Sequence, residues 1–421
     1  MAEARVNEYK LHFIVLILVA LTEFIGTKKI SIGIGVIALF PMLYALVLGG
    51  AISWPKFKFL SEKEMNVAAN ILGVSFLIFI AKLGANIGPE LPKLLGSGVS
   101  LIVQEMGHIV GTIALGLPVA LWLGLKREAI GATYSLDREP NLAIIVDKFG
   151  ANSAEARGAL GVYVCGTLFG AIYMSILASI LGSSGLFHPI SLAMGAAVGS
   201  GSMMAAATGS LAVIFPEAQK DIAFYSGAAN LMMSIVGTYI CIFFSLPVTQ
   251  KLYAWLEPII GRKSASSAAE GGEKKRMNQI LTIFIIGFIA LIGNWIGYKV
   301  PIMESLPGIL LLAVITLIGM GFTRILPFKS PVIVWISLFA MLATSPFFPG
   351  NEYTAAAIAK INLLALATPI LAYAGLSLGK DVHLFKQLSW RIVVVSLVVF
   401  TGTFLFATLF AEIVFKFQGE F

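Results

Sequence analysis

The chain has 421 residues, of which 58% are hydrophobic and only 12% are charged. A soluble protein of this size needs more polar side chains to cover its surface, so the composition excludes a soluble enzyme or nucleic-acid-binding domain. The formal net charge is +7. Because the basic residues fall in short loops between apolar segments, that charge indicates membrane topology and not a nucleic-acid partner.

Long apolar stretches recur along the chain. A hydrocarbon core of about 30 Å requires roughly 20 apolar residues per helix. The sequence therefore predicts an all-α polytopic membrane protein with about 11 transmembrane helices, expected at 11–26, 30–51, 65–87, 98–124, 157–182, 222–247, 277–298, 304–323, 332–347, 354–378 and 392–415.

Two segments do not fit this pattern. Residues 125–150 contain several charges and Pro140, and residues 187–214 are rich in Gly, Ser and Ala. The basic linker 248–276 is expected in the cytoplasm. If both segments are re-entrant, one entering from the cytoplasm and the other from the exterior, the crossings counted from this linker place most Lys and Arg in the cytoplasm. Two full crossings would preserve the same parity, which leaves an alternative with 13 helices.

This topology predicts a multi-pass protein of the inner (cytoplasmic) membrane, with its N-terminus in the cytoplasm and its C-terminus at the exterior. A short motif also recurs. Gly84-Ala85-Asn86-Ile87-Gly88-Pro89-Glu90 reappears 291 residues later as Gly375-Leu376-Ser377-Leu378-Gly379-Lys380-Asp381. The same offset carries the first four helices onto the last four, and the predicted topology gives the two copies opposite orientations.

The sequence therefore divides into five parts: a first four-helix repeat (1–124), a candidate transport unit (125–247), a cytoplasmic linker (248–276), an extra helix (277–301) and a second, inverted repeat (302–421).

The two broken segments supply the candidate substrate-binding residues. Non-helical backbone at membrane depth is tolerated only where it is buried in protein or lines a watery cavity. Small side chains permit close backbone approach, and hydroxyl groups beside a helix N-terminus suit a carboxylate. The candidates are Ser135, Asn141, Ser200, Gly201, Ser202, Thr208 and Ser210. Tight helix packing through small residues is the alternative interpretation of such a run.

A second group of residues is a candidate for coupling transport to Na⁺ or H⁺. Glu105 and His108 share one face of the fourth helix at i, i+3, and ionisable side chains inside a membrane face a cavity or a partner. Asp137 and Asn230 join them as candidates. A hydrogen-bonded structural pair is the alternative. No catalytic residue, metal site or organic cofactor is predicted.

Three segments resemble a prokaryotic integral-membrane family known as a domain of unknown function: Val103-Gln104-Glu105-Met106-Gly107-His108, Arg138 to Ile145, and Gly199 to Ala207. More distantly, the order of elements across 84–182 is similar to half of a sodium/glutamate symporter, a group with inverted repeats like those of citrate and bile-acid-type carriers. This resemblance implies a cation-coupled elevator transporter of a small organic anion, and a possible homodimer. Here, however, both broken segments precede the linker, so the second half would be circularly permuted.

The expected function is therefore secondary active transport, with the bilayer and a small-molecule substrate as partners and no nucleic acid. The alternatives are a passive channel or holin-like export pore and, less favoured, an intramembrane hydrolase based on Gly182-Ser183-Ser184-Gly185. The four histidines are scattered along the chain, and no nucleotide-binding G-x-x-x-x-G-K-[ST] loop occurs.

Overall fold

The computed structural model describes residues 8–32, 35–92, 99–135, 138–198, 200–262, 278–325 and 332–418. Over this part of the chain the fold is helical apart from one two-stranded hairpin. The elements up to residue 183 are α1 (Glu8–Ile25), β1 (Lys28–Ile32), β2 (Gly35–Leu39), α2 (Pro41–Ile52), α3 (Glu62–Ile87), η1 (Gly88–Glu90), α5 (Val99–Trp122), α6 (Glu128–Thr133), α7 (Arg138–Phe149), α8 (Ala154–Cys165), η2 (Gly166–Gly170) and α9 (Ala171–Ser183).

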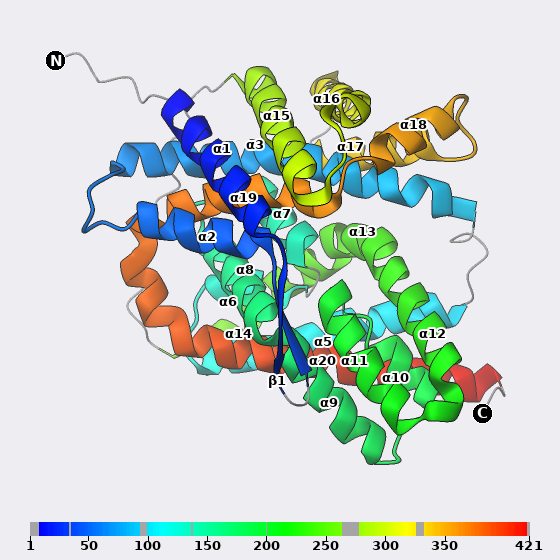
Figure 1. Ribbon diagram of the computed structural model, residues 1–421. Helices are drawn as coiled ribbons and strands as arrows, with labels where there is room; N and C mark the ends of the chain where they lie inside the picture. Colours follow the sequence, from blue (N-terminus) through cyan, green and yellow to red (C-terminus); the bar gives the residue numbers. More distant parts are fainter. Residues whose placement is uncertain are drawn as a thin grey trace.

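The remaining elements are α10 (Pro189–Gly195), α11 (Gly201–Ile214), η3 (Pro216–Ala218), α12 (Gln219–Met232), η4 (Met233–Gly237), α13 (Thr238–Ile240), η5 (Cys241–Ser245), α14 (Leu246–Ile260), α15 (Gln279–Tyr298), α16 (Ile302–Ile325), α17 (Val332–Thr344), α18 (Asn351–Ala359), α19 (Leu363–Leu378), η6 (Gly379–Asp381) and α20 (Val382–Gln418). In Figure 1, α15 to α17 lie on one side, α2, α3 and α19 lie in the middle, and α5 and α20 run together on the other side.

Six helical stretches of the described chain are long and apolar enough to cross a bilayer: Glu62–Ile87, Val103–Trp122, Ala154–Ser183, Gln279–Tyr298, Ile302–Ile325 and Trp390–Gln418. A seventh is available if α18 and α19 together form one bent span. Three further apolar helices, α2, the stretch Met203–Ile214 and α17, are shorter. The protein is therefore a polytopic membrane protein.

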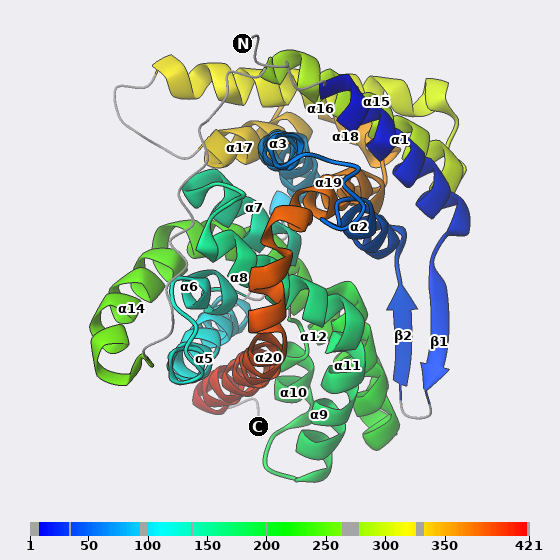
Figure 2. The ribbon, with the colours of Figure 1, turned by 90° about the vertical axis from the view of Figure 1, so that its left-hand side faces the viewer.

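The predicted helix over 30–51 is wrong in its first half. Residues 28–32 and 35–39 pair as antiparallel strands, with Lys28 opposite Leu39 and Ile32 opposite Gly35. Isoleucine and valine alternate here with Ser and Gly, and β-branched residues favour a strand whereas Gly disfavours a helix. The helix begins only at Pro41, after which it is 12 residues long. Figure 2 shows the hairpin running from α1 and α2 along the side of the molecule.

The predicted helix over 354–378 is also interrupted. It is divided into α18 and α19, whose axes differ by 56°. Polar side chains satisfy the backbone groups freed at this bend. The Asn294 amide nitrogen donates to the Lys360 carbonyl oxygen at 3.0 Å, its Oδ1 accepts from the Asn362 amide at 2.9 Å, and Lys82 Nζ donates to the Ile358 carbonyl oxygen at 3.0 Å.

Helices α5 and α20 cross closely and run antiparallel. A Cβ added to Gly107 would lie 2.6 Å from the Phe406 carbonyl oxygen, and one added to Gly116 would lie 2.6 Å from Val399 Cγ2. Residue numbers therefore rise along α5 as they fall along α20. Near the middle of the crossing, Thr112 and Thr403, which are 291 residues apart, share a hydrogen bond of 2.7 Å between their hydroxyls.

Other close contacts occur in pairs with the same offset. A Cβ on Gly84 of α3 would overlap the Ser337 carbonyl oxygen of α17, and a Cβ on Gly375 of α19 would overlap the Leu46 carbonyl oxygen of α2. Gly375 lies 291 residues after Gly84, and Leu46 lies 291 residues before Ser337, so the second contact repeats the first. The motif glycines are therefore required where helix backbones touch.

Whole helices repeat this arrangement. Helix α1 packs against α2 as α16 packs against α17. Helix α6 packs against α5 as α10 packs against α20, and α8 contacts α20 as α12 contacts α5. Two π-helical turns, η2 after α8 and η4 after α12, follow the same correspondence. Each half of the described fold thus contains four helices of the repeat and one broken helix pair. One half has α1, α2, α3 and α5 with the pair α6/α7, and the other has α16, α17, α18/α19 and α20 with the pair α10/α11.

Candidate functional site

The first break separates α6 from α7. Helix α6 is held against α8 at very short range, because a Cβ on Gly131 would overlap the Glu155 carbonyl oxygen and a Cβ on Gly158 would overlap that of Glu128. A buried ion pair reinforces this contact, with Arg157 Nη2 at 3.2 Å from Glu128 Oε1. The start of the broken segment is thereby fixed to the long helix that follows it.

Side chains on both sides of this break bridge it. Asn141 Nδ2 donates to the Ser135 carbonyl oxygen at 3.0 Å, and the Tyr134 hydroxyl donates to the Asn141 carbonyl oxygen at 2.7 Å. Ser245, in the π-helical turn η5, donates to the Tyr134 carbonyl oxygen. Asn141 is buried, and its Oδ1 has no hydrogen-bond partner among the described residues. Of the predicted residues, Ser135 and Asn141 therefore lie together, and Asp137 lies outside the described residues.

The second break separates α10 from α11. At its beginning the His188 amide donates to Glu412 Oε2 at 2.9 Å, and burial lowers the pKa of the His188 imidazole while the Glu412 carboxylate opposes that shift. Helix α10 ends where a Cβ on Gly195 would overlap Thr408 Oγ1 of α20. The backbone then passes through the fully buried Ala196 and Val198.

Helix α11 begins next to a buried cap. Ser200 is its N-cap, is buried, and accepts from the Met203 amide at 3.5 Å. Gly201 is exposed, and no atom lies within 4 Å of the position that a Cβ would take there. Ser202 lies in the same first turn of the helix. The start of α11 is thus open at Gly201 beside a buried cap, and the N-terminus of a helix favours an anion.

The remaining predicted residues of this segment differ in their hydrogen bonds. Thr208 Oγ1 is buried without a hydrogen-bond partner among the described residues. Ser210, in contrast, shares a 2.7 Å hydrogen bond with Ser175 of α9 and donates to the Ala206 carbonyl oxygen at 3.1 Å, so it helps to join α11 to α9. Asn230 lies on α12, one turn after Ser226, which donates to the Ala193 carbonyl oxygen of α10 at 2.9 Å.

The predicted coupling pair lies on α5. Glu105 Oε2 is 3.4 Å from His108 Nδ1, and each residue is only 1% exposed. Glu105 Oε1 and His108 Nε2 have no hydrogen-bond partner among the described residues. A Cβ on Gly237, in the π-helical turn η4, would lie 2.8 Å from Glu105 Oε1. The Glu105 carboxyl group therefore abuts the helical turn that follows α12, further along the chain from the second broken segment.

Both breaks lie against the same two helices, since α6 and α10 each contact α5 and α20. The ion pair between Arg157 and Glu128 was not predicted from the sequence. The sequence does hold a signal for this pair, because its charged residues stand at the ends of two apolar segments. Each of them lies close to a glycine, Gly131 or Gly158. The π-helical turns η2 and η4 have no sequence signal beyond the glycines Gly170 and Gly237 that end them.

Comparison with known proteins yields one family. Neither the curated proteins nor the solved structures include a significant match to this chain. Residues 20–255, which run from α1 to α14, match the family described as a protein of unknown function (DUF3100). This range covers more than half of the 421 residues. The chain therefore belongs to the DUF3100 family of uncharacterised proteins.

Proposed function

We propose that the protein is a secondary active transporter of a small organic anion, coupled to Na⁺ or H⁺. The observation that carries the proposal is the pair of helix breaks, α6/α7 and α10/α11, which pack in corresponding ways on the antiparallel helices α5 and α20. Broken helices at corresponding positions of two halves are typical of secondary transporters, in which they hold substrate near the middle of the membrane.

The second break supplies the features that an anion requires. Backbone amides without helical partners are costly in hydrocarbon, so they are tolerated only where protein buries them or where they line a water-filled cavity. At the start of α11 the buried Ser200 cap adjoins the open position at Gly201, and the helix N-terminus favours an anion. Across the fold, Asn141 Oδ1 at the first break is a buried acceptor that a protonated or hydroxyl-bearing group of the substrate would satisfy.

The Glu105–His108 pair is the proposed coupling site. Two buried ionisable side chains, each with one polar atom unsatisfied, are expensive unless a proton or cation occupies the site during transport. Glu105 contacts the helix that follows the second break, through Gly237. Binding of a proton or cation to this pair would therefore affect the packing of the substrate-binding segment.

The proposed mechanism is alternating access by an inverted repeat, with α6 to α14 as the moving unit. The reciprocal contacts at an offset of 291 support it, as in Thr112 with Thr403. Because α5 and α20 are equivalent and antiparallel, a two-fold rotation that exchanges them has its axis across both helices. Such an axis lies in the plane of the membrane if these helices span it.

The test is uptake into proteoliposomes, using a panel of radiolabelled mono-, di- and tricarboxylates and an imposed Na⁺ or H⁺ gradient. We expect saturable uptake of at least one anion, stimulated by one gradient. Glu105→Gln should abolish the stimulation, whereas Ser396→Ala, at the position 291 residues later, is the matched control and should retain it. Non-saturating flux that ignores both gradients would indicate a channel and contradict the proposal.

A further inference from the structure

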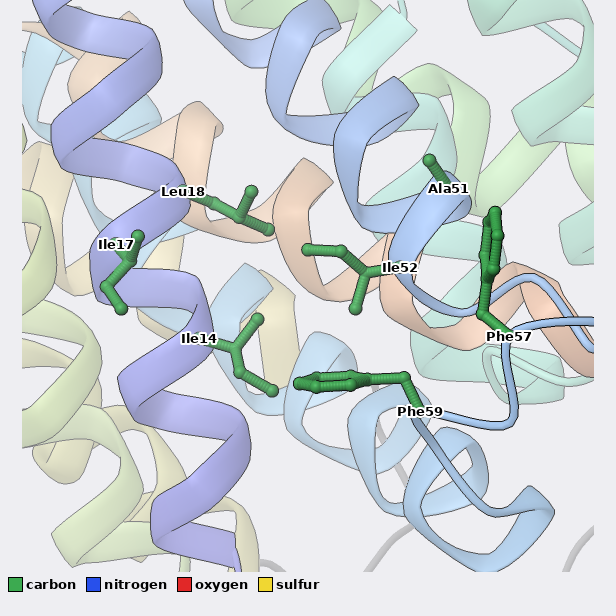
Figure 3. Close-up of a pocket in the computed structure, with 7 residues that line it drawn as sticks. All are labelled: Ile14, Ile17, Leu18, Ala51, Ile52, Phe57 and Phe59. Atoms are coloured by element: carbon green, nitrogen blue, oxygen red, sulfur yellow. The ribbon is translucent and has the colours of Figure 1, made fainter.

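An open apolar groove lies between α1, α2 and the loop that follows α2, and no residue of either helix break lines it. Its volume is about 480 Å³, within the range of roughly 300 to 1,000 Å³ in which proteins hold small ligands. Seven side chains line it, all of them hydrocarbon: Ile14, Ile17, Leu18, Ala51, Ile52, Phe57 and Phe59. Figure 3 shows α1 on one side of the groove, and α2 with the following loop on the other. Its occupant must therefore present hydrocarbon.

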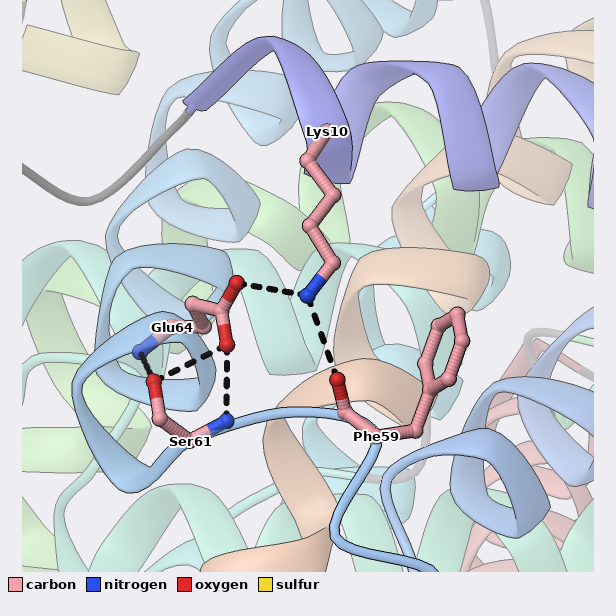
Figure 4. A network of polar contacts seen from close by, with 4 residues as sticks. All are labelled: Lys10, Phe59, Ser61 and Glu64. Atoms are coloured by element: carbon pink, nitrogen blue, oxygen red, sulfur yellow. Dashed lines mark hydrogen bonds and ion pairs between the residues drawn. The ribbon is translucent and has the colours of Figure 1, made fainter.

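The loop that forms one wall is held at both ends. At its beginning, Ser53 donates from Oγ to the Gly375 carbonyl oxygen of α19 at 2.9 Å. At its end, Lys10 Nζ on α1 donates to the Phe59 carbonyl oxygen at 3.1 Å and to Glu64 Oε1 at 2.8 Å. Glu64 Oε2 in turn accepts from the Ser61 amide at 2.7 Å. Figure 4 shows this network joining α1, the loop and the start of α3. The groove wall is thus preformed.

Two large apolar side chains of this loop are left uncovered. Phe57 is 72% exposed and Phe59 is 54% exposed. Lys58, between them, has a backbone φ of 49°, a left-handed conformation that is strained for a residue with a side chain. In this conformation the Phe59 ring extends toward α1 and the Phe57 ring stands beside Ala51 of α2, as Figure 3 shows. Large apolar side chains such as Phe next to lysines are typical of segments that lie in the membrane–water interface.

The charge around the groove identifies its occupant. Lys56 and Lys58 are exposed and alternate with the two phenylalanines, and residues 53–60 include no acidic side chain. Of the two acidic side chains that follow the loop, Glu62 is exposed to solvent and Glu64 is paired with Lys10. A ligand with a hydrocarbon chain and an anionic headgroup would satisfy both the apolar lining and the two exposed lysines. Phospholipid is the molecule of this chemistry that a bilayer supplies.

We propose that this groove binds an anionic phospholipid, with one acyl chain between α1 and α2 and the headgroup phosphate at Lys56 and Lys58. This site is independent of the proposed transport site. It predicts that lipids with identical acyl chains will be distinguished by headgroup charge. A surface that only contacts bulk lipid would not make that distinction.

The experiment is native mass spectrometry of the purified full-length chain, titrated with palmitoyl-oleoyl phosphatidylglycerol or with phosphatidylcholine of the same chains. We expect phosphatidylglycerol to bind more tightly. Lys56→Gln with Lys58→Gln should weaken its binding by about tenfold or more, since each interfacial lysine contributes roughly fivefold to the affinity for anionic lipid. The charge-matched control, Lys220→Gln with Lys251→Gln, removes two exposed lysines elsewhere and should leave binding unchanged.

A second variant tests the groove itself. Ala51→Phe places a ring in the groove and should reduce the binding of both lipids, whereas Val47→Phe, one turn earlier on α2 and not in the groove lining, should not. Equal affinity of the wild-type chain for the two lipids, or unchanged binding by Ala51→Phe, would overturn the proposal. So would a loss of dimers in Ala51→Phe without a loss of lipid, because the groove would then be an interface between copies of the chain.

Discussion

The contact of α3 with α17 and the contact of α2 with α19 use the same chemistry. Gly84 meets the Ser337 carbonyl oxygen in the first, and Gly375 meets the Leu46 carbonyl oxygen in the second. The ionisable pair on α5 has no such duplicate, because the positions 291 residues after Glu105 and His108 are Ser396 and Val399. Equivalent positions thus agree where backbones must touch, and they differ where a charge lies inside the fold.

A second comparison concerns the two helix breaks. Helix α6 is tied to α8 by the buried pair of Arg157 and Glu128, whereas α10 is tied to α12 by the neutral hydrogen bond from Ser226 to the Ala193 carbonyl oxygen. The two broken segments therefore share a packing scheme but differ in polarity.

The largest effect is expected at the charged contact. Arg157→Met should destabilise the protein by about 3–5 kcal/mol, because the Glu128 carboxylate would remain buried without its partner. Ser226→Ala, at the corresponding neutral contact, should cost only about 1 kcal/mol. The midpoint of thermal unfolding in detergent measures both losses. The double variant Arg157→Met/Glu128→Leu should recover most of the stability, and equal losses in the two single variants would refute the comparison.

The two motif glycines should respond alike. Gly84→Ala and Gly375→Ala should each lower stability by about 1–3 kcal/mol, since each new methyl group would overlap a carbonyl oxygen of the neighbouring helix. Gly321→Ala is the control, because no atom lies within 4 Å of its Cβ position. Thermal unfolding again provides the measurement. If one of the two motif variants is as stable as the wild-type chain, the contacts are not equivalent.

The smallest effects on stability are expected at the breaks. Ser200→Ala removes the cap of α11 and should cost about 1 kcal/mol. Asn141→Ala removes the bond to the Ser135 carbonyl oxygen and should cost a similar amount, about 1 kcal/mol. Both should also raise the substrate concentration for half-maximal uptake. Ser210→Ala, whose hydroxyl bonds to Ser175, should lose stability alone. Unchanged half-saturation in the first two variants would remove these residues from the site.

Hydropathy was sufficient to locate most of the helices, because a span of about 20 apolar residues is a strong signal. It could not distinguish the hairpin at Lys28 to Leu39 from a helix, since strands and helices bury the same apolar side chains. The bend before α19 was also missed. It depends on Asn294, from another helix, which bonds to the Lys360 carbonyl oxygen and the Asn362 amide.

The candidate site followed from the sequence where neighbours are local. Glu105 and His108 are one helical turn apart, and Asn141 reaches Ser135 across a single short break. Contacts between distant segments could not be predicted in this way. The approach of Glu105 to Gly237, and the pairing of Arg157 with Glu128, exist only once the helices are packed.

The central claim is that the second break lies in a substrate site reached from either side of the membrane in turn. It is tested most directly by labelling Gly201→Cys, in a chain whose Cys165 and Cys241 are replaced by alanine, with a membrane-impermeant maleimide applied to one face at a time. We predict labelling from both faces, with an imposed ion gradient raising the rate on one face as it lowers the rate on the other. Labelling from one face only under every gradient would contradict the claim.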